Sequence, residues 1–298
     1  MKFTRHLSLL FVSLLALALL AAACGEEEPA DTGGSDNGSA GGDASEELRL
    51  VNEGLLTVGS DIPYPPFEFE EAGELTGFDV EIVREVADRL GLESPDDAWI
   101  STDFGTIFQQ LASGSQFDIV AAAVTGYAPE GSPAAETVAD RTAVVDFTIP
   151  FYPSLQSLTV DSEASPDITG VDSVPDGARV GVQRATTGAF YAEENLTGAD
   201  LVSFEKAPQM YQQLQAGQLD AVFNDLPVTV DSIEDKPSLE VVEQVETGEE
   251  YAIAVSKDNP GLRDAIDGAL EEMFADGSFA EIYTKYFPEQ ELPEYASE

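Results

Sequence analysis

The fold of this chain is constrained most by a regular alternation of short apolar strands and amphipathic helices that starts near Leu55. In residues 78–90, apolar side chains recur every three or four positions before Gly91, which is typical of a helix with a glycine stop. The elements expected in this first part are strands at 55–59, 98–101 and 117–124 and helices at 78–90 and 104–112. Such an alternation predicts an α/β fold with parallel strands.

The alternation resumes near Leu155 and continues to Tyr286. The expected elements are strands at 155–160, 178–183, 200–204, 219–225 and 251–256 and helices at 187–195, 207–217, 260–275 and 278–286. The segment QQLASGSQFDIVAAAV (109–124) is echoed by QQLQAGQLDAVFND (212–225), each a helix end, a glycine turn and an apolar strand. Two α/β lobes of similar plan would produce this echo, and so would a generic helix–glycine–strand unit.

The N-terminus has the layout of a secretory signal peptide. Lys2 and Arg5 give a short basic start, and residues 7–23 are apolar, too short for a comfortable membrane span, and end in small residues. We therefore expect residues 1–23 to be a signal peptide and the protein to be extracytoplasmic.

Cys24 is the only cysteine of the chain and stands where the apolar stretch ends. The preceding LLAAAC resembles a bacterial lipobox, in which the cysteine becomes the lipidated first residue, although Ala21 occupies the position where leucine is commonest. We expect lipidated Cys24 to anchor the protein to the cell membrane, with residues 24–49 as a flexible acidic tether. The alternatives are an ordinary signal peptide with an incidental cysteine and an uncleaved apolar anchor.

The chain carries 57 Asp and Glu against 13 Lys and Arg, a formal net charge of −44. Nucleic-acid binding needs basic surfaces, so the composition excludes it. The acids are spread along the chain, which favours an acidic solvated surface suited to salty surroundings over attraction of a cationic ligand. One cysteine and one histidine, His6 in the leader, argue against a disulfide, a metal site and histidine catalysis; no cofactor is expected.

Several segments together resemble one known family. They are DIPYPPFEFEEAGELTGFDVEIVREVADRLG (61–91), FDIVAAAVT (117–125), DRTAVVDFTIPFY (140–152), VGVQRATTG (180–188), QLDAVFNDLP (218–227) and NPGLRDAIDGALEEMFADGSFAEIYTKYF (259–287). In this order they are similar to the bacterial extracellular solute-binding proteins of family 3, the amino-acid receptors of ABC importers. The similarity covers roughly residues 50–290.

The resemblance implies a periplasmic-binding-protein-like fold of type II, with two α/β lobes joined by two crossing hinge strands. Lobe 1 would comprise residues 50–154 plus 246–298, and lobe 2 residues 155–245. The ligand would lie in the cleft between them, and the lobes would close over it by a hinge motion. A monomer is expected.

A free amino acid has a carboxylate and an ammonium, and both charges must be paired when they are buried. For the carboxylate, the resemblance implies Arg141, whose planar fork can bind it in a bidentate fashion. Thr125 would add a hydroxyl and a backbone N–H, and Ala123 would leave room for its main chain. Thr186 and Thr187 precede a helix whose N-terminus favours an anion. The alternatives are a surface arginine paired with an acid and threonines that only cap the helix.

The stretch between Thr125 and Arg141 is longer than is usual in the family. This insertion, residues 126–140, would either reposition the arginine or build a lid.

For the ammonium, the resemblance implies Asp225 from lobe 2 and Asp61 from lobe 1. Each has an alternative as a simple cap, Asp225 of the following helix and Asp61 of a turn. Tyr64, held among prolines, and Phe104 would form an aromatic sandwich around the side chain; both have an alternative as core aromatics.

Gln183 and Asn224 stand where family members contact the ligand side chain. Both are neutral and polar, which favours a polar uncharged ligand such as glutamine over arginine or lysine. No further cation is evident nearby, which argues against aspartate or glutamate as the ligand.

We therefore expect a receptor without catalysis, which delivers a free amino acid to the membrane permease of an ABC importer. One alternative is an enzyme on the same fold, similar to cyclohexadienyl dehydratase and acting on a small carboxylic acid, but no histidine, spare lysine or cysteine is available as its acid or base. The other alternative is an amino-acid sensor domain.

Overall fold

The structure is a computed structural model of the chain, and it describes residues 48–114 and 116–296. These residues all lie within a single compact unit. The predicted signal peptide (1–23), Cys24 and all but the last two residues of the predicted tether (24–49) lie outside the described residues.

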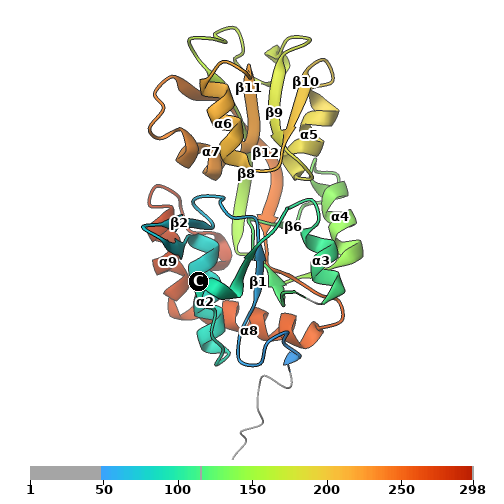
Figure 1. Cartoon of the computed structure of the whole chain (residues 1–298), viewed down its shortest axis with the longest axis vertical. Helices are drawn as coiled ribbons and strands as arrows, with labels where there is room; N and C mark the ends of the chain where they lie inside the picture. The colour runs from blue at the N-terminus through green and yellow to red at the C-terminus, as the bar shows by residue number, and fades with distance from the viewer. Residues whose placement is uncertain (1–47, 115, 297–298) are drawn as a thin grey trace, which may run out of the picture. The chain divides into compact units, whose positions relative to one another are not determined.

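Two sheets form the framework of the described chain (Figure 1). The first has five strands in the order β4 (Trp99–Ser101), β1 (Val58–Ser60), β5 (Ile119–Val120), β13 (Ala254–Val255) and β7 (Asp146–Phe147). Strands β4, β1 and β5 are parallel, and β13 runs antiparallel to both β5 and β7. We call the part built on this sheet lobe 1.

The second sheet has six strands in the order β10 (Asp200–Phe204), β9 (Arg179–Gln183), β11 (Ala221–Asp225), β8 (Tyr152–Asp161), β12 (Leu239–Tyr251) and β6 (Thr125–Tyr127). Strands β10, β9 and β11 are parallel, as the alternation predicts. We call the part built on these three strands lobe 2.

Strands β8 and β12 connect the two lobes. They pair antiparallel from Leu239 opposite Asp161 to Tyr251 opposite Tyr152, and Figure 1 shows both strands spanning the two lobes. β6 pairs only with the last residues of β12, at the lobe 1 end. These are the two connecting strands that the family resemblance implies.

Helices cover the two sheets on the faces where their apolar residues point. Lobe 1 carries α2 (Phe78–Arg89), α3 (Ile107–Ser113), α4 (Ala135–Val144), α8 (Pro260–Asp276) and α9 (Ser278–Tyr286). Lobe 2 carries α5 (Thr187–Asn195), α6 (Ala207–Gln215) and α7 (Leu226–Ile233). The remaining elements are the hairpin β2 (Phe69–Glu71) and β3 (Glu74–Thr76) and the 3₁₀ turns η1 (Asp96–Ala98), η2 (Val171–Ser173) and η3 (Glu294–Ala296). In lobe 2, α5 and α6 pack on β9 and β11.

The predicted periodicity is confirmed for α2, α5, α9 and β10, whose bounds match within one residue. The predicted strand at 117–124 is too long, because only Ile119–Val120 form β5. Ala123 adopts φ 47°, a left-handed conformation that ends the extended chain. The helix predicted from Phe104 begins at Ile107, because Asp103 first accepts the Gly105 N–H in a turn.

An aromatic cluster fills the junction between lobe 1 and the connecting strands. Phe67 is fully buried and meets the rings of Tyr152 and Tyr251 edge-on, with centroid distances of 5.3 and 5.4 Å. Edge-to-face aromatic contacts add stability beyond the area they bury. This cluster fixes the end of β12 where polar side chains of both lobes converge.

Candidate ligand-binding site

A narrow cavity lies between the two lobes: about 10 Å³ of it can hold the centre of a water-sized sphere, and the space free of atoms is about 300 Å³ when its opening to solvent is counted. Its lining residues are Asp61, Tyr64, Phe104, Ala122, Ala123, Thr125, Arg141, Gln183, Thr186, Thr187 and Asp225. The structure thus brings together ten of the eleven residues expected to bind the ligand. The exception is Asn224, and Ala122 is an addition.

Arg141 lies on α4, a helix that begins within the insertion (126–140) and ends beyond it. The residue is only 6% exposed. One guanidinium nitrogen donates to the carbonyl of Thr125 at 2.9 Å, and another to the carbonyl of Ala185 at 3.5 Å. The guanidinium carbon lies 5.3 Å from the ring centres of both Phe104 and Phe108. The contact with these two rings and the two carbonyl acceptors partly replace the hydration that the guanidinium loses on burial.

Among the described residues, Arg141 makes no ion pair with any carboxylate. The alternative of a surface arginine paired with an acid is therefore wrong. Burial lowers the pKa of Arg141 to about 10, against the opposing charges of Glu249 and Asp225, so the group remains cationic at neutral pH. A buried cation with spare donors is suited to bind an anion.

Asp225 ends β11 and occupies the N-cap position of α7, yet its side chain makes no capping hydrogen bond. Instead the carboxylate accepts from the hydroxyls of Tyr64 and Tyr251, each at 2.7 Å, and from the amide of Gln156. The capping alternative is therefore wrong. Burial, followed by the charge of Glu249, raises the pKa of Asp225 to about 6.

Sequence reasoning missed Glu249, which lies on the connecting strand β12 and is almost fully buried. Its carboxylate accepts from the hydroxyls of Thr125 at 2.6 Å and Thr187 at 2.7 Å, and also from Thr247 and Gln156. The Thr125 hydroxyl, which was expected at the ligand carboxylate, is thus donated to Glu249, as is the hydroxyl of Thr187. No local pattern marks Glu249, because it is one of five glutamates in residues 239–251 and only the structure shows that it is buried.

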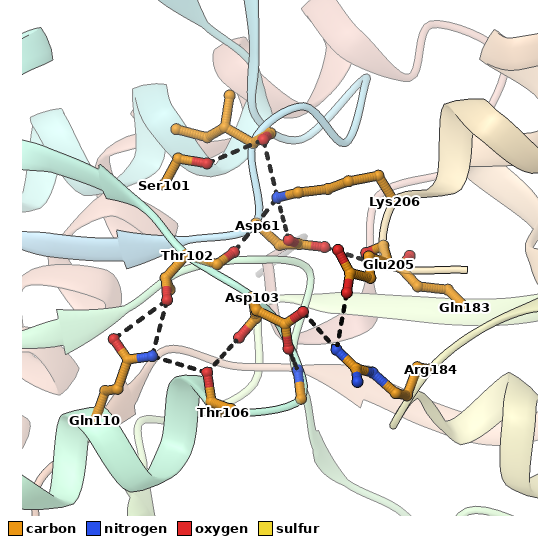
Figure 2. A network of polar contacts seen from close by, with 12 residues as sticks. Asp61, Ser101, Thr102, Asp103, Thr106, Gln110, Gln183, Arg184, Glu205 and Lys206 are labelled. Atoms are coloured by element: carbon orange, nitrogen blue, oxygen red, sulfur yellow. Dashed lines mark hydrogen bonds and ion pairs between the residues drawn. The ribbon is translucent and has the colours of Figure 1, made fainter. Parts of the chain in front are cut away.

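Asp61 follows β1 and lines the cavity from lobe 1 (Figure 2). One carboxylate oxygen accepts from the amide of Gln183, and the other from the ammonium of Lys206, both in lobe 2. Burial raises the pKa of Asp61 to about 6 although Lys206 lowers it. The expectation that no further cation lies near the site was wrong: Lys206 is distant in sequence and no local pattern marks it.

The backbone of the lining is held by specific contacts. Asp79, from the GFD segment at the start of α2, accepts the N–H of Ala123 at 2.9 Å and so fixes the left-handed turn after β5. Thr186 caps α5 by accepting the N–H of Ala189 at 3.1 Å, so the capping interpretation holds for this residue. Because Thr186 also lines the cavity, the first turn of α5, with its free backbone N–H groups, lies at the cavity wall.

The remaining predicted residues form the walls. Tyr64 and Phe104 are both nearly buried and lie on the cavity. Asn224 lies behind the wall, with its amide oxygen 3.4 Å from the Tyr64 hydroxyl and its amide nitrogen donating to Tyr211. Asn224 therefore lies behind the cavity wall and does not line the cavity.

Residues 48–114 and 116–296 contain neither a candidate metal cluster nor a candidate membrane-spanning helix. No group of three or more His, Cys, Asp or Glu side chains is arranged to hold a metal ion in this part of the chain. None of its helices combines the length and apolarity needed to cross a membrane.

Comparison with known proteins gives a family match over most of the chain. The model of the family described as "Bacterial extracellular solute-binding proteins, family 3" matches residues 56–289. Among curated proteins, the L-cystine-binding protein TcyJ of Escherichia coli K12 is 28% identical over 242 residues, which cover 80% of this chain and 85% of that protein.

Two solved structures share the fold at higher identity. An ancestral arginine-binding protein bound to arginine is 31% identical with a TM-score of 0.70, covering 78% of this chain and 98% of that one. The same kind of protein bound to glutamine is also 31% identical, with a TM-score of 0.71, covering 80% and 100%. The prediction of a two-lobed α/β fold of the periplasmic-binding-protein type II is confirmed.

Proposed function

Because the chain belongs to family 3 of the bacterial extracellular solute-binding proteins, we propose that it is a lipid-anchored receptor that binds a free amino acid with a polar uncharged side chain and delivers it to an ABC importer. The observation that carries this proposal is the placement of Arg141 and Asp225, from different lobes, on one cavity. The relatives reported above are named as binding proteins, and we propose binding without catalysis here as well.

The cavity offers one charged group to each end of a zwitterion. Arg141 is buried, cationic and without a carboxylate partner among the described residues, so it would receive the ligand carboxylate together with the first-turn N–H groups of α5. Thr125 and Thr187 would contribute backbone N–H groups, because their hydroxyls are donated to Glu249. Asp225 would accept the ligand ammonium.

The rest of the ligand would lie between the aromatic walls. Tyr64 and Phe104 present apolar ring faces to the aliphatic part of an amino acid. Gln183 turns its amide nitrogen to Asp61 and leaves its side-chain oxygen buried without a partner in the described structure. A ligand with a neutral N–H donor, such as the amide of glutamine, would satisfy that oxygen.

Contacts between the lobes close the cavity in this conformation. Lys206 and Gln183 from lobe 2 reach Asp61 in lobe 1, and Arg184 pairs with Asp103 at 2.7 Å. We propose that lobe 1 comprises residues 50–154 plus 246–298 and lobe 2 residues 155–245. A hinge motion at β8 and β12 would open these contacts to admit the ligand.

We propose that the receptor acts at the outer face of the cell membrane. Lipidation of Cys24, with residues 1–23 removed and 24–49 as tether, would keep the receptor near its permease. We propose that the receptor acts as a monomer, since one chain supplies the whole cavity lining.

The experiment that tests the proposal is a thermal-shift screen of the full-length protein in detergent against the twenty amino acids. A ligand that binds only the folded state raises the melting temperature in proportion to the logarithm of its excess over Kd. Stabilisation by at least one neutral polar amino acid is expected. If none of the twenty raises the melting temperature at millimolar concentration, the receptor function is rejected.

A further inference from the structure

The ammonium of Lys206 donates three hydrogen bonds from lobe 2 to lobe 1. Lys206 precedes α6 in lobe 2, and its ammonium points into lobe 1, as Figure 2 shows. There it donates to a carboxylate oxygen of Asp61 and to the carbonyls of Ile62, at 3.0 Å, and Thr102, at 3.3 Å. An ammonium has three N–H donors, so these acceptors match its full capacity.

The partner of Lys206 is a carboxylate of the cavity wall. The side chain of Asp61 is 3% exposed, whereas that of Lys206 is 26% exposed. The second oxygen of Asp61 accepts from Gln183, so each oxygen accepts at least one hydrogen bond in this conformation. A carboxylate buried to this degree needs a compensating charge, and Lys206 supplies it from outside the cavity lining.

The acidic residues around the cavity offer no free carboxylate to a cationic side chain of the ligand. Only Asp61 and Asp225 contribute carboxylates to the described lining, and Asp225 is the proposed partner of the ligand ammonium. The nearby Glu249 is held by three hydroxyls and the amide of Gln156. A ligand guanidinium or second ammonium would have to displace Lys206 from Asp61 or remain buried without a counter-charge of its own.

We propose that Lys206 is a specificity-determining residue, which neutralises Asp61 and thereby restricts the cavity to amino acids with uncharged side chains and excludes arginine and lysine. This inference rests on the proposed amino-acid binding. The unpartnered side-chain oxygen of Gln183 beside Asp61 supplies a neutral acceptor for the favoured ligands.

The test compares the Kd of L-arginine with that of L-glutamine, or of the neutral amino acid that stabilises the protein most, by isothermal titration calorimetry on the full-length chain. Titrations are made at pH 8.5 to keep Asp61 ionised, since loss of Lys206 raises the pKa of Asp61 further. The variants are Lys206→Met and, should its circular dichroism show misfolding, Lys206→Gln. Arg184→Met is the matched control, because Arg184 also pairs across the lobes but its partner Asp103 does not line the cavity.

The native chain should bind the neutral amino acid about 100-fold or more tightly than arginine. Removal of Lys206 should reduce this ratio of affinities by about tenfold or more, because the buried carboxylate of Asp61 then becomes available to the arginine side chain. Arg184→Met should leave the ratio unchanged. A native chain that prefers arginine, or a Lys206 variant that weakens both ligands equally, overturns the inference while the receptor function stands. A native chain that binds no amino acid overturns the receptor function itself, and this inference with it.

Discussion

The hydroxyl of Tyr64 in lobe 1 donates a hydrogen bond of 2.7 Å to the carboxylate of Asp225 in lobe 2. The proposed aromatic wall and the proposed ammonium site are thus one unit that exists only when the lobes are closed. Tyr251, from the connecting strand β12, donates to the same carboxylate oxygen. In the closed conformation two tyrosine hydroxyls therefore hold the carboxylate of Asp225 in one orientation at the proposed ammonium site.

Replacement of Asp225 by asparagine is expected to weaken amino-acid binding by about 100-fold or more, because the ligand ammonium would then be buried without a counter-charge. Calorimetric titration with the amino acid identified in the thermal-shift screen measures this effect. The matched control is Asp220→Asn, since Asp220 makes an exposed pair with Arg179 at 3.2 Å. Near-native affinity in a folded Asp225→Asn protein would contradict the assignment of the ammonium site.

Replacement of Arg141 by lysine is expected to weaken binding by about 30-fold or more, because lysine keeps the charge but loses the bidentate fork. It also loses the guanidinium's position beside the rings of Phe104 and Phe108. The same substitution at the half-exposed Arg179 should leave the affinity unchanged. If both variants bind equally well, Arg141 does not hold the ligand carboxylate.

The pH dependence of binding is expected to have an acid limb centred near the pKa of Asp225, which burial and the charge of Glu249 raise to about 6 in the free protein. Above that pH Asp225 is ionised and binds the ammonium; below it, protonation competes and affinity falls by up to tenfold per pH unit. Asp61, whose pKa is also about 6, contributes to the same limb.

Substitution of Glu249 by glutamine tests the cause of this limb. Removal of a neighbouring negative charge stabilises the ionised form of Asp225, so its pKa should fall and the acid limb should move to lower pH. Affinities measured by calorimetry between pH 4.5 and 8 would reveal the shift. An acid limb that stays in place, or moves to higher pH, would show that the charge of Glu249 does not control Asp225.

Substitution of Cys24 by alanine is expected to release the protein from membranes, because the lipid attachment site is lost. Fractionation of cells that express the native and variant chains, with immunodetection in each fraction, measures the distribution. A variant that remains in the membrane fraction would indicate that the apolar residues 7–23 are retained as the anchor.

The sequence by itself determined many helices and strands and most of the cavity lining, but the expected elements did not include α4 or, apart from Tyr251, the connecting strand β12. Helix α2 is specified by apolar residues at helical spacing and a glycine stop, which are local properties that the isolated segment already contains. The family motifs likewise marked Arg141 and Asp225, because each stands at a fixed offset within a recognisable segment. A cavity between two lobes was therefore predictable in outline.

Only the tertiary structure decided how the charges around that cavity are paired. Lys206 and Asp61 are 145 residues apart, and Glu249 and Thr125 are 124 apart, so no local spacing links them. Their contacts arise because β8 and β12 bring the lobes together. Water is excluded between the closed lobes, so each buried charge is stable only beside a group that pairs with it. The sequence showed which groups were present; folding decided which of them remained available to a ligand.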